Sequence, residues 1–594
     1  MITKYIKNIA AVGFVCCMVN VAFTSCNDFI DVEPQGVISE DLAMSQPDEM
    51  VTSAYAKLGD DWYTYPFNLW PYGDVSSDDA MKGGSGTTDT NYHPVEVWST
   101  LTASTPDHMD ELWYHFYCSI SRCNRALVSL AEYGESKLGA ETTKIREGEV
   151  RFLRAHFYFK LVQLWYQVPW VDEEVYKNHT EEQTPNNAFS HEELMQKIID
   201  DFKFAYDVLP TVQPQGGRAN KTAAAAYLAK CYLTMAWGDG YEANTGVSHI
   251  NQQYMQEVVK YTDVVKANPA YGYLEDFGDI FLPEYKNSKE SVFAVQHSDY
   301  QDDNTLYGRG NWSNMLNGCW GIWSCGWDFH KPTQNLVNAF KTKDGLPMFD
   351  DYNKVTSYPT NGVPTAQKWD PRLFHTVGMP SFPYKYETSF VNANGERVQM
   401  MTKDNSRTPN TYGYYASMKE VPQRSHGETF DNPWQAFAMN DYVIRYTDVM
   451  LMRAEALIET GKLEEARQII NDIRQRAKNS VAKHISYAAD QCEIALYPAS
   501  YFSSKEQARK CLQWERRLEL AMECGRYFDL RRWGIASQTL NKFFEKEKDV
   551  SYDGQTYAQY YKDAHFTAGK NEYFPLPYIQ LFYVPGLYTQ NKGY

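Results

Sequence analysis

The chain lacks an excess of positive charge, and this argues against a nucleic-acid partner. Its 594 residues include 57 Lys and Arg but 75 Asp and Glu, which gives a formal net charge of −18. Proteins that bind nucleic acid usually carry basic patches that neutralise phosphates. We therefore expect no nucleic acid among the partners.

Motifs of the common enzyme classes are also missing. His191-Glu192-Glu193 begins like a zinc-protease motif but lacks the second histidine, and no Cys/His cluster has zinc spacing. No glycine-rich phosphate loop is present. A glycosidase needs two carboxylates placed across a sugar, and 75 acids offer too many pairs for spacing to select one. We predict a protein that is not an enzyme and has no cofactor.

A disulfide framework is not evident, although the chain has 11 cysteines. Cys118 and Cys123 fall within one predicted helix, where a spacing of five residues points the side chains apart. The others lie among apolar neighbours, so we predict buried thiols. Cys319 and Cys325 bracket a stretch rich in glycine and tryptophan that a disulfide could close, and this pairing stays open.

The apolar run from about Ile9 to Phe23 is too short to cross a bilayer as a helix, and Lys4 and Lys7 precede it as in a signal peptide. It ends in Thr24-Ser25-Cys26, which looks like a lipobox; an ordinary signal with an incidental cysteine is the alternative. We predict that residues 1–25 are removed and that Cys26 carries lipid, which anchors the protein to a membrane. The formal charge then becomes −20, because two lysines and no acids are lost.

Helical patterns dominate two blocks of the chain. Ser190 and Glu193 form a capping box at the start of a helix that Pro210 ends. Further helices are predicted at about 221–236 and 253–267, and Gly461 separates a pair at about 446–458 and 466–477. Such pairs are typical of tetratricopeptide-like stacking.

The segments at about 270–440 and 550–594 are rich in Gly, Pro, Asn and aromatic residues and predict long ordered loops. Long loops on a rigid scaffold usually carry function. No Ser/Gly/Pro linker divides the chain. We predict a mainly α fold with minor β, in which residues 26–594 form a single large globular domain.

Four stretches carry a resemblance to a known family. Residues 149–170 look like its long helix and proline turn, although Tyr166-Gln167 replaces the usual Gly-Asp pair. Residues 441–456 are similar to its core helix, and 515–533 match its most recognisable motif, which Cys524 interrupts. The chain closes with Pro575-Leu-Pro577 and Gln590-Asn591-Lys592-Gly593-Tyr594. On these residues the mature chain resembles the SusD/RagB family of outer-membrane nutrient-binding lipoproteins.

The resemblance implies a surface-exposed lipoprotein of the cell outer membrane, with a SusD-like part at about 26–240 and a SusD/RagB part at about 270–594. It implies a lid on a SusC-like TonB-dependent transporter that receives the captured nutrient. The aromatic-rich loops favour an oligo- or polysaccharide as ligand; peptide capture, as in RagB-like relatives, is the alternative, and an enzyme that trims the polymer is a third. From their residue types alone, Glu515, Arg516, Glu519 and Arg526 indicate partly buried ion pairs and not catalysis.

Glycan binding needs flat aromatic faces against the sugar rings and planar polar groups for the hydroxyls. The region from Trp62 to Trp98 offers both, around a glycine-rich loop at 82–86. The ligand-binding residues predicted in it are Tyr72, Asp74, Asp78, Asp79 and Trp98. Its three acids could instead hold a structural calcium ion or be simple solvated acids.

A second region runs from Trp312 to Trp327. Its tryptophans at 320, 323 and 327 would form a buried stripe on a helix. Gly318, Gly321 and Gly326 make a stable helix unfavourable, so at least one indole should face solvent, first of all that of Trp320. The ligand-binding residues predicted here are Trp312, Trp320, Trp323 and Trp327. Tyr412 and Tyr414 are a third candidate, which could equally cover the core or contact the transporter.

Overall fold

The computed structural model describes residues 39–594 except 61, 106–107, 239–248, 299–315, 324–325, 355–366, 392–394, 427–428, 431–435, 553–554 and 557–559. The predicted signal peptide, Cys26, Trp312 and Cys325 therefore lie outside the described residues. In the described part of the chain, no helix is both long enough and apolar enough to cross a membrane.

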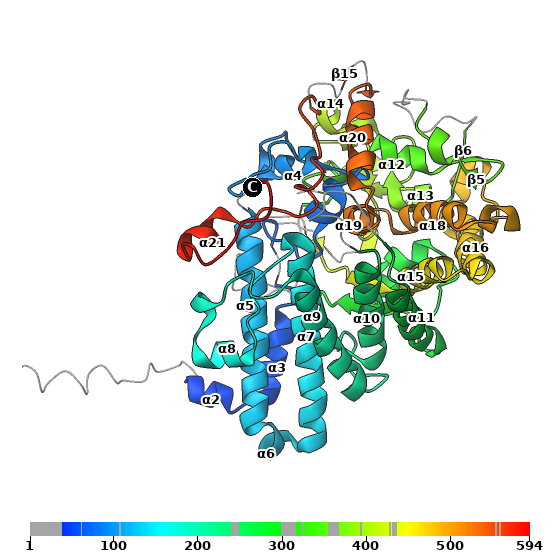
Figure 1. The fold of residues 1–594 in the computed structure, drawn as a ribbon. Coiled ribbons are helices and arrows are strands. Elements are labelled where there is room, and N and C mark those ends of the chain that lie inside the picture. Colours follow the sequence, from blue (N-terminus) through cyan, green and yellow to red (C-terminus); the bar gives the residue numbers. More distant parts are fainter. Residues whose placement is uncertain are drawn as a thin grey trace, which may run out of the picture.

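Helices that follow one another along the chain pack side by side (Figure 1). The first block contains α3 (Pro47–Ala56), α5 (His108–Ser129), α7 (Ala140–Trp165), α9 (His191–Val208), α10 (Lys221–Ala236) and α11 (Gln252–Ala267). The second contains α15 (Tyr446–Glu459), α16 (Leu463–Asn479), α18 (Lys505–Leu520), α19 (Arg526–Arg532) and α20 (Ala536–Glu547). Because α11 packs against α15, the second block continues the first. The mainly α, tetratricopeptide-like prediction is confirmed.

Local sequence explains where these helices begin and end. The Ser190 hydroxyl accepts the amide N–H of Glu193 at 3.2 Å, and the Glu193 carboxylate accepts the Ser190 amide N–H at 2.7 Å, which confirms the capping box. Alanines 223–226 and 229 are all buried where α10 packs between α9 and α11. Gly461, with φ of +85°, forms the turn between α15 and α16.

Shorter elements join the two blocks, and the sheets are small, as predicted. The other helices are α2 (Glu40–Met44), α4 (His93–Val97), α6 (Glu135–Leu138), α8 (Glu173–Asn178), α12 (Gln334–Ala339), α13 (Leu373–Thr376), α14 (Pro409–Tyr412), α17 (Val481–His484) and α21 (Tyr578–Tyr583). Antiparallel pairs are β1 (Ala80–Gly83) with β3 (Phe329–Pro332), and β2 (Ser291–Val295) with β13 (Asp441–Arg445). The remaining strands are β4 (Lys341–Lys343), β5 (Leu346–Pro347), β6 (Lys368–Trp369), β7 (Val377–Gly378), β8 (Phe390–Val391), β9 (Arg397–Val398), β10 (Ala416–Ser417), β11 (Thr429–Phe430), β12 (Ala436–Phe437), β14 (Ser551–Tyr552) and β15 (Gln555–Thr556).

Buried ion pairs lock the second block together. The Glu519 carboxylate lies 3.0 Å from Arg372 and 2.9 Å from Arg445, and it also pairs with Arg476. Glu515 pairs with Arg372 and Arg474, Arg516 with Asp448 and Asp529, and Arg526 with Asp78. The structural role predicted for these motif residues is confirmed.

The cysteines that the structure describes are unbridged thiols, namely those at 118, 123, 231, 319, 492, 511 and 524. Burial raises the pKa of Cys123 to about 12, and it does the same for Cys511. Such thiols carry little thiolate at neutral pH, so they are poor nucleophiles. The prediction of buried thiols holds for Cys123, Cys231, Cys319 and Cys511, while Cys118, Cys492 and Cys524 are half-buried. The pairing of Cys319 with Cys325 stays open.

Candidate ligand-binding surface

The loop that precedes β3 is folded back on itself. The backbone N–H of Asp328 donates to the carbonyl oxygen of Gly318 at 2.9 Å. Between these residues, Gly326 approaches the other side of the loop very closely. A Cβ added at Gly326 would lie 2.5 Å from the carbonyl oxygen of Cys319. Glycine is therefore required at 326, and the loop cannot be replaced by a regular helix.

The three described tryptophans of this loop differ in exposure. Trp320 is 41% exposed, Trp327 is half-buried, and Trp323 is 1% exposed, with its ring edge against Phe437. The expectation that Trp320 faces solvent is confirmed, and the buried helical stripe is wrong. The expectation that Trp323 offers a ligand-binding face is also wrong, because its ring is enclosed by core residues.

Arg407 holds the two outer indoles together. Its guanidinium carbon lies 5.6 Å from the ring centre of Trp320 and 4.6 Å from that of Trp327, within cation–π range. The guanidinium also pairs with Asp89 at 3.2 Å. We call Trp320, Trp327, Arg407 and Asp89 the Trp320 platform. It offers a partly exposed flat ring beside a planar hydrogen-bond donor.

Asp89 is fixed by the glycine-rich loop that the sequence singled out. Its carboxylate accepts the backbone N–H of Ser85 at 2.9 Å and the Ser85 hydroxyl at 2.8 Å. Partial burial acts to raise the pKa of Asp89, but these hydrogen bonds and the nearby Lys82 and Arg407 outweigh it and lower that pKa. Asp89 therefore stays ionised at neutral pH and keeps Arg407 in place.

The pairing of β1 with β3 brings the two predicted aromatic regions to the same place. The ammonium of Lys82, at the end of β1, donates to the carbonyl oxygens of Gly83, Gly86 and Asp89 at 2.7 to 2.9 Å and so shapes the loop. Sequence reasoning missed Asp89 and Arg407. They are separated by 318 residues, and no motif or spacing connects them.

Trp98 and Tyr72 do not form the predicted binding face. Trp98 is 1% exposed; its indole N–H donates to the carbonyl oxygen of Ser76 at 3.1 Å, and its ring stacks on Phe574. Tyr72 is fully buried with its ring edge against the same Phe574. The exposed platform expected of these two residues is wrong, because the C-terminal segment covers them.

The predicted acidic ligand contacts Asp74, Asp78 and Asp79 are wrong as well, because all three are buried. Asp78 pairs with Arg526 at 2.9 Å and with Arg517 at 3.0 Å, and Asp79 pairs with Arg517 at 2.7 Å. Burial acts to raise the pKa of Asp78, but the two arginines lower it to about 2. Asp74 contacts His330 at 3.1 Å. The three acids are therefore buried partners of Arg517, Arg526 and His330 and are not solvated, while the calcium alternative stays a prediction.

Tyr412 and Tyr414 belong to the core, with exposed fractions of 0% and 3%. The Tyr412 ring lies 5.4 Å from the Lys82 ammonium and packs edge-on against Tyr560. Of the alternatives that the sequence left open, covering the core is the one confirmed, and a ligand-facing role is wrong.

One metal-like cluster occurs among the described residues, formed by Asp276, Asp279 and His484. The ammonium of Lys483 lies 2.7 Å from both carboxylate oxygens of Asp279. His484 contacts Asp279 at 2.7 Å. These hydrogen bonds already satisfy the Asp279 carboxylate, so the cluster is accounted for as an ion-pair network.

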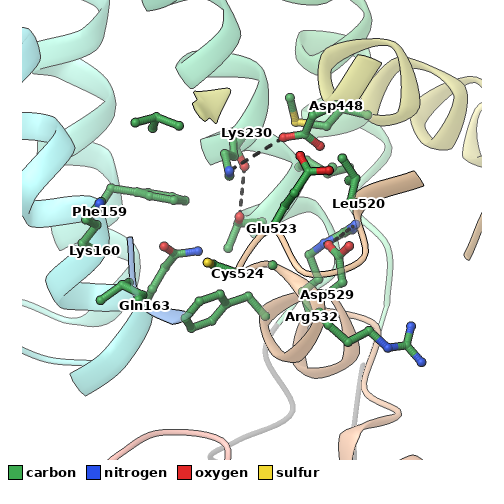
Figure 2. A pocket seen from close by; sticks show the side chains of 18 of the residues that line it. Phe159, Lys160, Gln163, Lys230, Asp448, Leu520, Glu523, Cys524, Asp529 and Arg532 are labelled. Atoms are coloured by element: carbon green, nitrogen blue, oxygen red, sulfur yellow. Dashed lines mark hydrogen bonds and ion pairs between the residues drawn. The ribbon is translucent and has the colours of Figure 1, made fainter. Parts of the chain in front are cut away.

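A separate pocket of about 610 Å³ lies between the helical stack and the α18–α19 motif (Figure 2). Phe159, Lys160 and Gln163 of α7 form one wall, and Lys230 of α10 and Asp448 of α15 form another. Its volume is in the range of about 300–1,000 Å³ common for small-molecule sites. Sequence analysis missed this pocket, because its walls come from segments more than 500 residues apart, from Leu58 to Tyr573, whose motifs indicated a structural role.

Comparisons with known proteins agree with this architecture. A SusD-like protein of Bacteroides ovatus is 24% identical over 532 residues, which cover 86% of this chain and 80% of that protein. A SusD homologue of Bacteroides thetaiotaomicron has the same fold, with a TM-score of 0.68, 19% identity and coverage of 93% and 97%. Surface glycan-binding protein A of Bacteroides fluxus is also similar, with a TM-score of 0.63, 18% identity and coverage of 94% and 100%.

Two family models match the chain. The model described as starch-binding associating with outer membrane matches residues 28–233, and the model of the SusD family matches residues 289–594, more than half of the chain. The chain therefore belongs to the SusD family.

Proposed function

We propose that this chain is a glycan-binding protein of the cell surface that captures an oligo- or polysaccharide on the Trp320 platform and does not cleave it. The observation that carries the proposal is the exposed indole of Trp320 beside the Arg407 guanidinium. A sugar ring can lie on the indole while its hydroxyls accept hydrogen bonds from the guanidinium. Membership of the SusD family and the glycan-binding name of a structural neighbour support it.

The exposed area sets the expected size of the effect. A tryptophan side chain offers up to about 250 Å², of which 41% leaves about 100 Å² for a ligand to cover. At about 25 cal/mol per Å², covering it contributes about 2.5 kcal/mol. Replacing Trp320 by alanine should then weaken binding by roughly 60-fold.

In this proposal the protein is held at the outer membrane by lipid on Cys26 and delivers its ligand to a SusC-like TonB-dependent transporter. Helix α21, on the left side of the coloured ribbon in Figure 1, supports a protein partner. Its side chains Tyr578, Phe582 and Tyr583 are 54%, 64% and 71% exposed. Clustered exposed apolar side chains of this kind mark interaction surfaces.

The test is calorimetric titration of residues 27–594 with plant, host and microbial polysaccharides. We expect saturable binding to one of them, a roughly 60-fold loss in Trp320→Ala, and no change in polymer size after incubation. Tyr114→Ala, which removes a 59% exposed ring on α5, is the matched control and should keep full affinity. Binding unchanged in Trp320→Ala would reject the platform. No binding to any polysaccharide of the panel would reject a glycan ligand and leave peptide capture as the alternative.

A further inference from the structure

The pocket beside α7 and α19 has a charge opposite to that of the molecule. Nine Lys and Arg side chains line it against seven Asp and Glu, whereas the whole chain has a formal charge of −18. Most of these cations are neutralised locally. Arg516, for example, lies 3.0 Å from Asp448 and 2.9 Å from Asp529. The excess therefore depends on a few side chains without such partners.

Arg531 is one of them. Its guanidinium lies over the ring of Tyr573 at 4.1 Å, and it donates to the backbone carbonyl oxygens of Gln163 at 2.6 Å and Glu572 at 3.0 Å. Within the described residues no carboxylate pairs with it. Both backbone bonds come from one terminal nitrogen, so the other terminal nitrogen and Nε remain available for a ligand.

Lys230 is the second, because its ion pair is long and shared. Its nearest carboxylate is that of Asp448, at 3.8 Å, and Arg516 already holds that group at 3.0 Å. The positive charge at this wall also acts on the neighbouring His156. Burial, followed by the charges of Lys160 and Lys230, lowers the pKa of His156 well below its ordinary value.

The lining of the pocket also includes a free amide and aromatic rings. Gln163 lies one turn after Lys160 on α7, and Figure 2 shows its side chain directed into the pocket. In the part of the chain that is described, this amide has no hydrogen-bond partner. The half-buried rings of Tyr254 and Phe528 also line the pocket and give it apolar surface.

We propose that this pocket binds a sugar acid of the hexuronate type. Arg531 and Lys230 bind its carboxylate, for which a guanidinium fork and a second cation are suited. Gln163 binds ring hydroxyls, and the half-buried aromatic rings of the lining cover the C–H face. The site is separate from the Trp320 platform and does not depend on it.

The experiment is calorimetric titration of residues 27–594 with D-galacturonate and with D-galactose, which differ only in the carboxylate at C6. We expect saturable binding of galacturonate, at least tenfold weaker binding of galactose, and an affinity that falls as salt is added. Succinate, which has carboxylates and no ring, should bind at least tenfold more weakly than galacturonate. Equal affinity for galactose, or no binding of galacturonate, would overturn the proposal. Succinate that binds as tightly as galacturonate would overturn the sugar assignment.

Variants locate the site. Arg531→Gln and Lys230→Gln should each weaken galacturonate binding at least tenfold, while Arg531→Lys, which keeps the charge, should lose less. Because Arg531 also bonds to backbone, Gln163→Leu is tested beside it, and circular dichroism verifies that each variant is folded. Trp320→Ala should leave galacturonate affinity unchanged. Affinity retained in folded Arg531→Gln and Lys230→Gln would refute the assignment, and loss in Trp320→Ala alone would move the sugar acid to the platform.

Discussion

Substitution of Glu519 by glutamine tests whether buried ion pairs hold the second helical block together. Glu519 is fully buried and pairs with Arg372, Arg445 and Arg476. Burial acts to raise its pKa, but the charges of Arg476, Arg445 and Arg372 outweigh burial and lower it. The carboxylate is therefore ionised at neutral pH, and the glutamine removes one negative charge from among three buried cations.

Removing one partner of a buried pair costs about 3–5 kcal/mol. The remaining carboxylates reduce the loss here, because Arg372 keeps Asp370 at 2.8 Å and Arg445 keeps Glu523 at 2.7 Å. We therefore expect about 3 kcal/mol, the lower end of that range. The assay is urea unfolding followed by circular dichroism at pH 7.

The matched control is Glu464→Gln, which removes an exposed partner of Arg467 on α16 and should leave the urea midpoint unchanged. Glycan affinity at low urea should be the same in both variants, because neither residue touches the platform. A loss below about 1 kcal/mol in Glu519→Gln, with the slope against urea unchanged, would refute the view that this network stabilises the fold.

Two further predictions concern one buried acid and one exposed helix. Both carboxyl oxygens of Glu547 are buried without a hydrogen bond in the described structure, and burial raises its pKa to about 8. An unfolded glutamate loses its proton near 4.5, so the folded state holds one more proton between pH 4.5 and 8 and loses stability as pH rises through that window. Glu547→Gln should remove roughly 3 kcal/mol of the decline in unfolding free energy between pH 5 and 8, and an unchanged decline would contradict this. On α21, Phe582→Ser with Tyr583→Ser should abolish co-purification with the transporter and spare glycan binding, whereas Val212→Ser, which also removes an exposed apolar side chain, should not; transporter retained by the α21 variant would exclude this helix as the contact.

The helical scaffold could be predicted because its determinants are local. The capping box at Ser190, the alanine-rich face of α10 and the turn at Gly461 each depend on residues within a few positions of one another. The predicted site was mostly wrong because burial is not local. Trp98 and Phe574 are 476 residues apart in the chain, and only the folded structure brings the C-terminal segment over the indole.

The exposure of Trp320, in contrast, could be predicted from neighbouring residues in the sequence. The glycines at 318, 321 and 326 indicated that its loop could not be a helix, and that local argument was sufficient to single it out. The contacts that hold Trp320 in place could not be predicted from the sequence. Arg407 contacts the indoles of both Trp320 and Trp327 and is itself fixed by Asp89.

The contact between Arg407 and Trp320 determines how tightly the platform can bind a glycan. An exposed indole that rotates freely must be ordered by its ligand, at a cost of about 0.5–1.5 kcal/mol per side chain. Arg407 orders Trp320 before a ligand arrives, and Asp89, kept ionised by Ser85 and Lys82, orders Arg407. The affinity of the platform therefore depends on a chain of contacts that begins in the glycine-rich loop. Residues that never touch the sugar should affect its capture through the position of one ring.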